Sequence, residues 1–381
     1  MHNDTMARGV LLLATAALLA ACADESPVQP AAKVPEGGVK AIALGINILP
    51  TGQQFPAKVA FVTGSAGGQP AKIQVYDAGG AQMARFQAFT DAWDQNAGVE
   101  AAVGDVNGDG WPDIIAGEGQ TLFSPSGSRF GVWDGKTGVY IGGYATSSTH
   151  RGGLRVGAGD INGDGRDEIF TCYGPGPQAT RVDVLRLNAT NIGYVKPSTG
   201  LGNFTGQNTY NGCRVAGGDV TGDGKDEMVV IFEGPNNTLW VHDPAGNNVL
   251  RSKPLGVYYT GTISVAVADA GGDGKAEVFL GRMVALDKLP PVSIFDGAAL
   301  MSSSTLPVPT MKYPLTGSIY NTGIYIAARD LSGDGLAELL VKPTTTGGNS
   351  MFVVRMGSTF TSIWVNKMEP PGNLPGGGPI G

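Results

Sequence analysis

Ionisable and reactive side chains are scarce in this 381-residue chain. Asp, Glu, Lys and Arg make up 15% of it, and it has three histidines and three cysteines. It contains no Gly-x-Ser-x-Gly elbow, no paired-cysteine zinc motif and no phosphate-binding loop. The positions of His2, His150 and His242 do not indicate a catalytic pair, and no basic stripe points to nucleic acid. The sequence therefore predicts no catalytic residue and no nucleic-acid partner.

Near the start, an apolar run too short to cross a membrane extends from Val10 to Leu19, after Arg8. It is typical of a secretory signal, and the sequence Leu19-Ala-Ala-Cys22 resembles a bacterial lipobox. That resemblance implies a signal peptide over residues 1–21 and a lipid on Cys22. It also implies an exported protein held at the outer membrane or cell surface. An ordinary cleaved signal stays as the alternative. Residues 22–37 are expected to be a lipidated flexible tether.

The chain does contain one acidic stretch that occurs in five copies. Its copies begin at Asp105, Asp160, Asp219, Asp269 and Asp330, at steps of 55, 59, 50 and 61 residues. Oxygen-bearing side chains fall at positions 1, 3, 5 and 9, except at position 3 of the fourth copy, and a glycine falls at position 6. A short loop with this pattern can wrap a hard cation, with position 7 offering its backbone carbonyl.

The expected metal ligands are Asp105, Asn107, Asp109, Trp111 and Asp113 in the first loop; Asp160, Asn162, Asp164, Arg166 and Glu168 in the second; Asp219, Thr221, Asp223, Lys225 and Glu227 in the third; Asp269, Asp273, Lys275 and Glu277 in the fourth; and Asp330, Ser332, Asp334, Leu336 and Glu338 in the fifth.

Short runs with period-two alternation precede the loops, and apolar runs rich in β-branched residues follow them, so each loop is expected to join two strands. Turn signals mark two further strands per unit, at Asp77–Gly80, Asp134–Gly138, Asp243–Gly246 and Asp296–Gly297. Four strands per unit at this period predict an all-β chain of propeller blades. An EF-hand is excluded because its last acid lies at position 12 and its flanks are helical.

With these loops and strands, the chain resembles the FG-GAP/VCBS family over residues 38–366. The resemblance implies a β-propeller with calcium in each loop between the first and second strands of a blade. A sixth unit without a metal loop is expected from 38–45 as first strand and 57–64 as second. Six blades follow, with seven as the alternative. Residues 367–381, rich in Pro and Gly, are expected to be a disordered tail.

Calcium also accounts for the acidity of the chain. Three carboxylates in each of five loops make fifteen, and about five calcium ions would change the formal charge of −7 to about +3. The first two loops are expected to bind most tightly. The fourth is expected to bind least tightly, because Gly271 offers no ligand at position 3.

The two remaining cysteines, Cys172 and Cys213, are expected at the same level of neighbouring blades. Cys172 lies four residues after Glu168 on an outgoing strand, and Cys213 six residues before Asp219 on the next incoming one. Export makes a disulfide between them possible, and two separate buried thiols are the alternative.

The function expected is a binding module for a protein or glycan, since loops on a rigid scaffold often carry binding residues. The alternatives are an enzyme at the channel mouth, marked by converging His, Tyr, Arg or Lys, and a structural envelope subunit. Strand directions put the metal loops on one rim and the variable loops on the other. The expected ligand face comprises the aromatics of the variable loops: Phe123, Tyr194, Phe204, Tyr210, Tyr258, Tyr259, Tyr313 and Tyr320.

Overall fold

Each acidic loop joins two six-residue antiparallel strands, as the alternation predicts. The pairs are β5 (Val99–Gly104) with β6 (Asp113–Glu118), β9 (Leu154–Gly159) with β10 (Glu168–Tyr173), β13 (Cys213–Gly218) with β14 (Glu227–Phe232), β17 (Ile263–Ala268) with β18 (Glu277–Arg282), and β21 (Ile324–Arg329) with β22 (Glu338–Pro343). In each pair the carboxylate at position 9 of the loop is also the first residue of the outgoing strand.

The computed structural model describes residues 40–41, 47–121, 123–125, 127–146, 149–177, 180–188, 191–194, 210–235, 237–243, 249–255, 259, 261–283, 292–303, 305–309, 311–313, 323–344, 351–356, 362–368 and 381. All of them belong to the second of two compact units, Met1–Lys33 and Val34–Gly381. Among these residues no helix is both long enough and apolar enough to cross a membrane.

Two further strands extend each pair outward in chain order. They are β7 (Arg129–Trp133) and β8 (Tyr140–Ala145), β11 (Val182–Asn188) and β12 (Asn191–Tyr194), β15 (Thr238–Asp243) and β16 (Val249–Pro254), β19 (Val292–Phe295) and β20 (Met311–Tyr313), and β23 (Met351–Met356) and β24 (Ser362–Met368). A sheet of β2 (Phe61–Gly64), β3 (Lys72–Tyr76) and β4 (Gln82–Gln87) precedes them. Strand β24 ends two residues beyond the expected boundary at 366.

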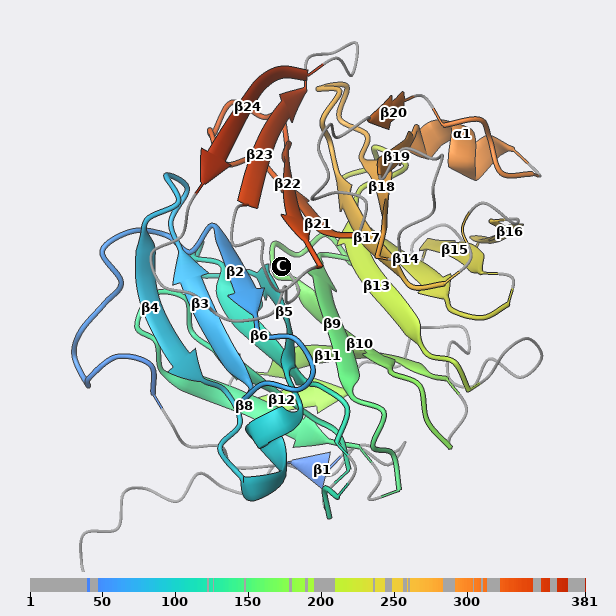
Figure 1. Ribbon diagram of the computed structural model, residues 1–381. Helices are drawn as coiled ribbons and strands as arrows, with labels where there is room; N and C mark the ends of the chain where they lie inside the picture. Colours follow the sequence, from blue (N-terminus) through green and yellow to red (C-terminus); the bar gives the residue numbers. More distant parts are fainter. Residues whose placement is uncertain are drawn as a thin grey trace, which may run out of the picture. The chain divides into compact units, whose positions relative to one another are not determined.

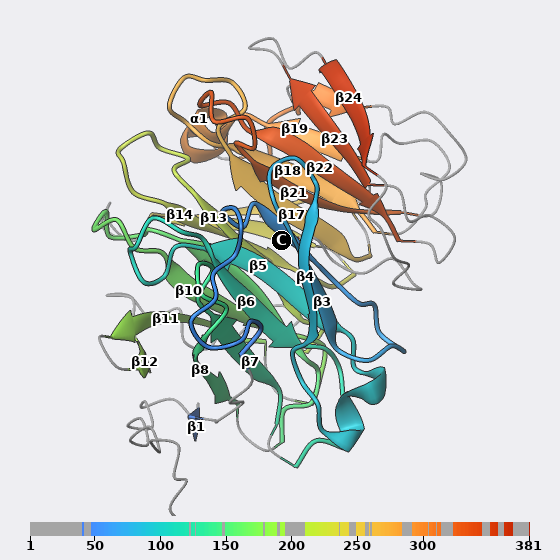
Figure 2. The same cartoon turned by 90° about the vertical axis from the view of Figure 1, so that its left-hand side faces the viewer.

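The first strands of successive sheets pack side by side, from β5 through β9, β13 and β17 to β21, with β2 beside β5. Figures 1 and 2 show the sheets fanning outward from these inner strands. Apolar side chains fill the space between neighbouring sheets; Ile115 and Phe130 of one sheet, for example, cluster with Leu154 and Ile169 of the next. Another cluster joins Phe61 and neighbouring residues of the β2–β4 sheet to the β21–β24 sheet. Sheet-to-sheet packing is therefore the source of the hydrophobic core.

The predicted place of residues 38–45, as the first strand of the sixth unit, was wrong. Their described part, β1 (Lys40–Ala41), pairs with the outer edge of β8 instead. Beside β2, the backbone of Gly381 exchanges two hydrogen bonds with Val62, at 2.8 and 3.1 Å. An open strand edge accepts any extended segment, because its N–H and C=O groups need partners, so the local pattern alone could not assign the edge.

Two of the predicted outer turns lie between strands, Asp77–Gly80 between β3 and β4 and Asp134–Gly138 between β7 and β8. Asp296 differs, because it begins a helix, α1 (Gly297–Ser302), and its side chain accepts a hydrogen bond from the N–H of Ala299 at 2.7 Å. Asp is favoured both in turns and at helix N-caps, which is why the sequence signal was ambiguous.

A disulfide joins Cys172 of β10 to Cys213 of β13, with their Cα atoms 5.8 Å apart. Both cysteines are buried, in the apolar cluster between their sheets. The bond closes a sequence separation of 41 residues. A native disulfide of this kind typically contributes about 2–4 kcal/mol to stability.

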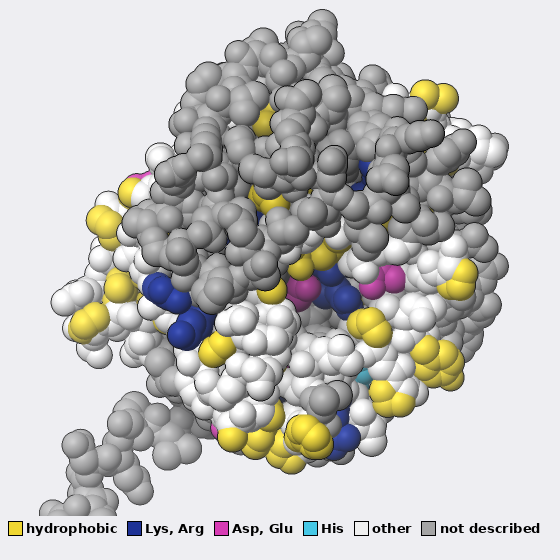
Figure 3. Space-filling view, viewed as in Figure 1, with side chains coloured by type: hydrophobic (Ala, Val, Ile, Leu, Met, Phe, Trp, Pro, Cys, Tyr) yellow, Lys and Arg dark blue, Asp and Glu magenta, His cyan; other side chains and the backbone are white. Residues whose placement is uncertain are grey.

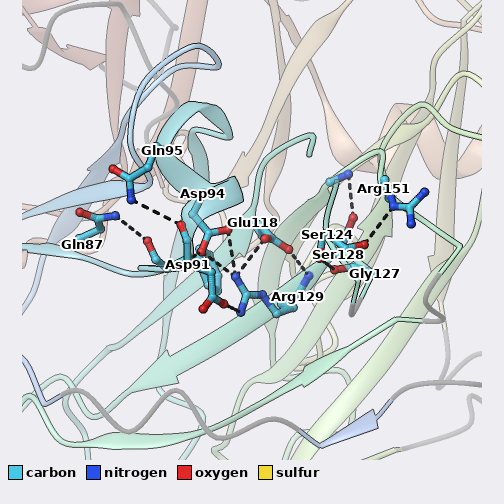
Figure 4. A network of polar contacts seen from close by, with 12 residues as sticks. Gln87, Asp91, Asp94, Gln95, Glu118, Ser124, Gly127, Ser128, Arg129 and Arg151 are labelled. Carbon is cyan, nitrogen blue, oxygen red and sulfur yellow. Dashed lines mark hydrogen bonds and ion pairs between the residues drawn. The ribbon is translucent and has the colours of Figure 1, made fainter. Parts of the chain in front are cut away.

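A buried ionic network holds the short 3-10 helix η1 (Ala92–Asn96) against the start of β7 (Figure 4). The guanidinium of Arg129 contacts Asp91 at 2.6 Å, Asp94 at 2.7 Å and Glu118 at 3.1 Å. It also lies 5.8 Å from the ring centroid of Trp93. Three carboxylates thus share one arginine. Burial of Glu118, together with the nearby Asp94, raises the pKa of Glu118 to about 9.

Glu118 is therefore ionised in the unfolded chain at neutral pH and takes up a proton on folding, so its contribution to stability is greatest below its unfolded pKa of about 4.5. We expect that contribution to decline between pH 4.5 and pH 9, by up to about 1.4 kcal/mol per pH unit. Glu118→Gln carries no titrating group and should flatten this decline. Urea unfolding at several pH values in saturating calcium measures it; equal slopes for variant and wild type would contradict the assignment.

Candidate functional site

The first aspartate of each loop organises the turn around its own carboxylate. In the third loop Asp219 accepts hydrogen bonds from the N–H groups of Gly222 (2.6 Å), Asp223 (3.0 Å) and Gly224 (2.8 Å). In all five loops the N–H groups of positions 4 and 6 donate to this side chain. The turn is thus shaped by the motif itself, with oxygen atoms gathered at its centre.

The carboxylates at positions 5 and 9 complete the third loop. Asp223 accepts from the N–H of Lys225 at 3.0 Å, and Glu227 accepts from the N–H and hydroxyl of Thr221 at 2.9 and 3.1 Å. Oxygens of Asp219, Asp223 and Glu227 all lie within 4.8 Å of one another. Three converging carboxylates match the oxygen donors that a hard cation such as calcium takes, so the residues fit such an ion.

The carboxylate at position 9 is buried in every loop. Burial raises the pKa of Asp113 to about 8, against the N–H of Gly135, which lowers it. Burial also raises the pKa of Glu277 to about 7. A cation bound beside such a group would favour its ionised form, so a cation would relieve the unfavourable burial of these carboxylates.

In the second loop, unlike the third, an arginine occupies the neighbourhood of the ligands. Arg186 of β11 hydrogen-bonds to Glu168 and lies 3.2 Å from Asp164. Its guanidinium already satisfies two of the carboxylates expected to hold a metal, and it would repel a cation. In the first loop, the amide nitrogen of Asn107 donates to Asp113 at 3.2 Å and to Asp134 at 3.1 Å.

Successive loops are connected through position 8, which the sequence reading left without a role. The N–H groups at this position donate to the carbonyl of position 1 in the preceding loop, as in Asp167 to Asp105 and Asp226 to Asp160, both at 2.9 Å. Ala276 and Ala337 repeat the bond in the next two loops. The side chains of Asp167 and Asp226 also accept hydrogen bonds from the backbone N–H groups of Asp105 and Asp160, at 2.8 and 2.9 Å. The small or acidic residue just before the last expected ligand is the sequence signal that could have revealed this connection.

The residue at position 7 reaches the preceding loop as well. A Cβ added at Gly272, position 4 of the fourth loop, would lie 2.6 Å from the side chain of Leu336, while one added at Gly274 would meet nothing within 4 Å. Both glycines have positive φ, 74° and 78°. In the fourth loop, position 4 is therefore restricted by backbone conformation and also by contact with the Leu336 side chain, and position 6 by conformation alone.

The residues expected on the ligand face divide into four groups. Phe123 and Tyr210 are exposed. Tyr259 is buried, and its hydroxyl donates to Ser293 at 2.9 Å, so its predicted place on an exposed face was wrong. Tyr194 and Tyr313 lie in β12 and β20, with side chains outside the described part. Phe204, Tyr258 and Tyr320 lie outside the described residues, as does Cys22.

A set of polar side chains that the sequence reading missed converges at the rim where the inner strands begin. Glu100 of β5 and Arg155 of β9 occupy the second position of their strands, as do Arg214 of β13 and Tyr325 of β21. Glu233, which follows β14, lies 3.2 Å from Arg214 and 3.5 Å from Arg155, and Arg214 lies 3.4 Å from Glu100. The available signal was a recurring polar or charged residue just inside each apolar strand.

Comparison with known proteins gives one family match. The sequence profile described as FG-GAP-like repeat matches residues 105–171 and 219–280. None of the curated proteins searched matches the chain.

Solved structures give distant matches. An Agrocybe aegerita lectin that recognises non-reducing terminal N-acetylglucosamine is 14% identical over 88% of this chain and 94% of its own, with a TM-score of 0.45. The protein AofleA from Arthrobotrys oligospora is 9% identical over 87% and 90%, with a TM-score of 0.49. A Bacillus licheniformis rhamnogalacturonan lyase is 14% identical over 89% of this chain and 61% of its own, with a TM-score of 0.41.

The contact between positions 4 and 7 of neighbouring loops gives a stability prediction. Gly274→Ala should cost about 1–2 kcal/mol through the positive φ alone. Gly272→Ala should cost more, because Leu336 must also move. Adding Leu336→Ala to Gly272→Ala should recover the excess, whereas adding it to Gly274→Ala should not. Thermal unfolding of the two cycles measures this coupling, and equal coupling at both glycines would contradict the contact.

Proposed function

Since residues 105–171 and 219–280 are FG-GAP-like repeats, we propose that Val34–Gly381 is a calcium-stabilised six-bladed β-propeller that binds a protein or a glycan. The proposal includes export and a lipid anchor on Cys22. Calcium, on this view, stabilises the scaffold, and the ligand binds elsewhere on it.

Six blades are supported by the six antiparallel sheets of the described residues. Their inner strands pack consecutively, and apolar clusters lie between neighbours, including the one between the β21–β24 and β2–β4 sheets. In the sheet of β2–β4, Gly381 takes the place next to β2 that the inner strand takes in the others. Counting each sheet as one blade thus gives six blades.

Calcium binding rests above all on the convergence of Asp219, Asp223 and Glu227 in the third loop. We propose that this loop binds most tightly, in place of the first two. Arg186 lies against two carboxylates of the second loop, so a cation there would have to compete with a guanidinium. The fourth loop has Gly271 at position 3 and would need water as a ligand there.

Removal of calcium should therefore destabilise the protein. We expect purified residues 23–381 to bind about five calcium ions, each contributing about 2.7 kcal/mol at a hundredfold excess over its dissociation constant. Differential scanning calorimetry in calcium and in excess chelator measures the fall in Tm. Asp223→Asn should reduce that fall more than Asp164→Asn does, because Arg186 already neutralises the second loop. An unchanged melt in chelator, with no metal by elemental analysis, would refute calcium binding.

The ligand is proposed to bind at the rim opposite the acidic loops. Uniform loops are expected of a structural device, and the opposite rim carries the connections of varied length together with exposed Phe123 and Tyr210. A cavity also opens there.

An enzyme is the second candidate, because Arg155, Arg214 and Tyr325 converge near that cavity, as an enzyme at the channel mouth would require. The electrostatics of these three residues favour a binding role over a catalytic one. Burial, with Glu100 nearby, raises the pKa of Tyr325 to about 12, far from that of an effective general base at neutral pH. Both arginines are paired with glutamates.

The lipid anchor can be tested apart from the fold. Cys22→Ala should move the full-length protein from the membrane fraction to the soluble fraction, because one residue carries the proposed lipid. The calcium-dependent Tm should stay the same, since Cys22 precedes the unit Val34–Gly381. Detergent phase partitioning of wild type and variant provides the measurement; a variant that still partitions into detergent would place the anchor elsewhere.

A further inference from the structure

A cavity of about 590 Å³ opens at the rim where the inner strands begin, opposite the acidic loops. Its walls come from the segment 65–68 after β2, from η1 and the residues next to it, from 119–121 and Phe123 after β6, and from the start of β9. Its volume lies in the range of small-molecule sites, about 300–1,000 Å³. Charged side chains of both signs gather in the hollow seen in Figure 3.

The charges at this cavity cancel. Glu100 and Arg155 line it, and behind them the ion pairs of Arg214 with Glu100 and of Glu233 with both arginines bring two positive and two negative groups together. An acidic ligand would find each guanidinium already facing a carboxylate. A ligand with hydroxyl groups, which both donate and accept, could bond to guanidinium and carboxylate alike.

One of these groups has unused hydrogen-bonding capacity. The Nε of Arg155 is buried and has no hydrogen-bond partner among the described residues. Buried donors are normally satisfied, so the guanidinium of Arg155 keeps one donor that its ion pair with Glu233 does not use.

The wall of the cavity is rigid on one side and aromatic. Trp93 lines it and is held by Arg129, whose network with Asp91, Asp94 and Glu118 fixes η1 (Figure 4). Phe123 lies at the mouth with 79% of its surface exposed. Asn96 and Gln120 add two exposed amides.

We propose that this cavity binds a neutral oligosaccharide. The inference rests on the proposed binding function and names its site and ligand class. Aromatic faces would pack against the C–H groups of the sugar rings, and the amides, Glu100 and Arg155 would bond to the hydroxyls. Internal neutralisation of the charges selects against uronates and other anionic sugars, because binding an anion would require an existing ion pair to break.

The test uses the calcium-loaded protein and a panel of neutral hexose tetrasaccharides of differing linkage, with matched tetrasaccharides that carry one uronate. Isothermal titration should detect binding of at least one neutral probe and weaker binding of its uronate counterpart. Phe123→Ala should weaken that binding about tenfold, or about 1.4 kcal/mol, without a change in Tm, since the side chain is exposed. Glu100→Gln, which keeps the shape but loses the charge, should weaken it similarly.

The matched control is Val308→Ala, an exposed apolar side chain outside the residues that line the cavity, which should leave the affinity unchanged. If Val308→Ala abolishes binding and Phe123→Ala does not, the cavity assignment is wrong although the binding module stands. Preference for the uronate probes overturns the ligand class. Cleavage of a probe, seen by mass spectrometry, overturns simple binding in favour of an enzyme. No binding to any probe rejects the glycan, while the calcium-dependent Tm judges the scaffold independently.

Discussion

The hydrogen bond from position 8 of one acidic loop to the carbonyl of position 1 in the loop before it sets the spacing of the sheets. It recurs from Asp167, Asp226, Ala276 and Ala337, and it links residues more than fifty positions apart in the chain. Because the acceptor belongs to the aspartate that folds its own turn, each turn is positioned by its own motif and by its neighbour. A displaced loop would therefore displace the inner strands on both sides.

The same inner strands carry the polar residues at the opposite rim. A strand such as β9 presents Arg155 near its start and leads into Asp160 at its end, so one rigid segment connects the two rims. The division of chemistry between the ends follows from strand direction. The carboxylates of the acidic loops gather where the inner strands end, and the mixed charges gather where these strands begin. A pocket lined by small residues of the inner strands, such as Ala102, Gly157 and Ala216, lies between them.

The loops and their flanking strands could be predicted from sequence because the determinants are local. Asp219 bonds to N–H groups three to five residues away, and alternation fixes which strand residues are buried. The partner of 38–45, the burial of Tyr259 and the helix after Asp296 could not be predicted, since each depends on which edge, cavity or cap the rest of the chain offers. Arg214 becomes a neighbour of Glu100, and Glu233 a neighbour of Arg155, only when their sheets have assembled.

The pairing of Gly381 with Val62 has a consequence for how the unit is assembled. These residues are 319 positions apart (381 − 62), whereas strands paired within a sheet are mostly a few tens of residues apart, and β1 and β8, with Lys40 opposite Ala145, are 105 apart. Bringing distant segments together costs more loop-closure entropy than forming contacts between nearby residues. Contacts between distant segments therefore slow folding. The sheets can therefore form one after another into an open arc before the last residues of the chain are in place. Until residue 381 arrives, the inner edge of β2 stays exposed and can pair with a strand of another molecule.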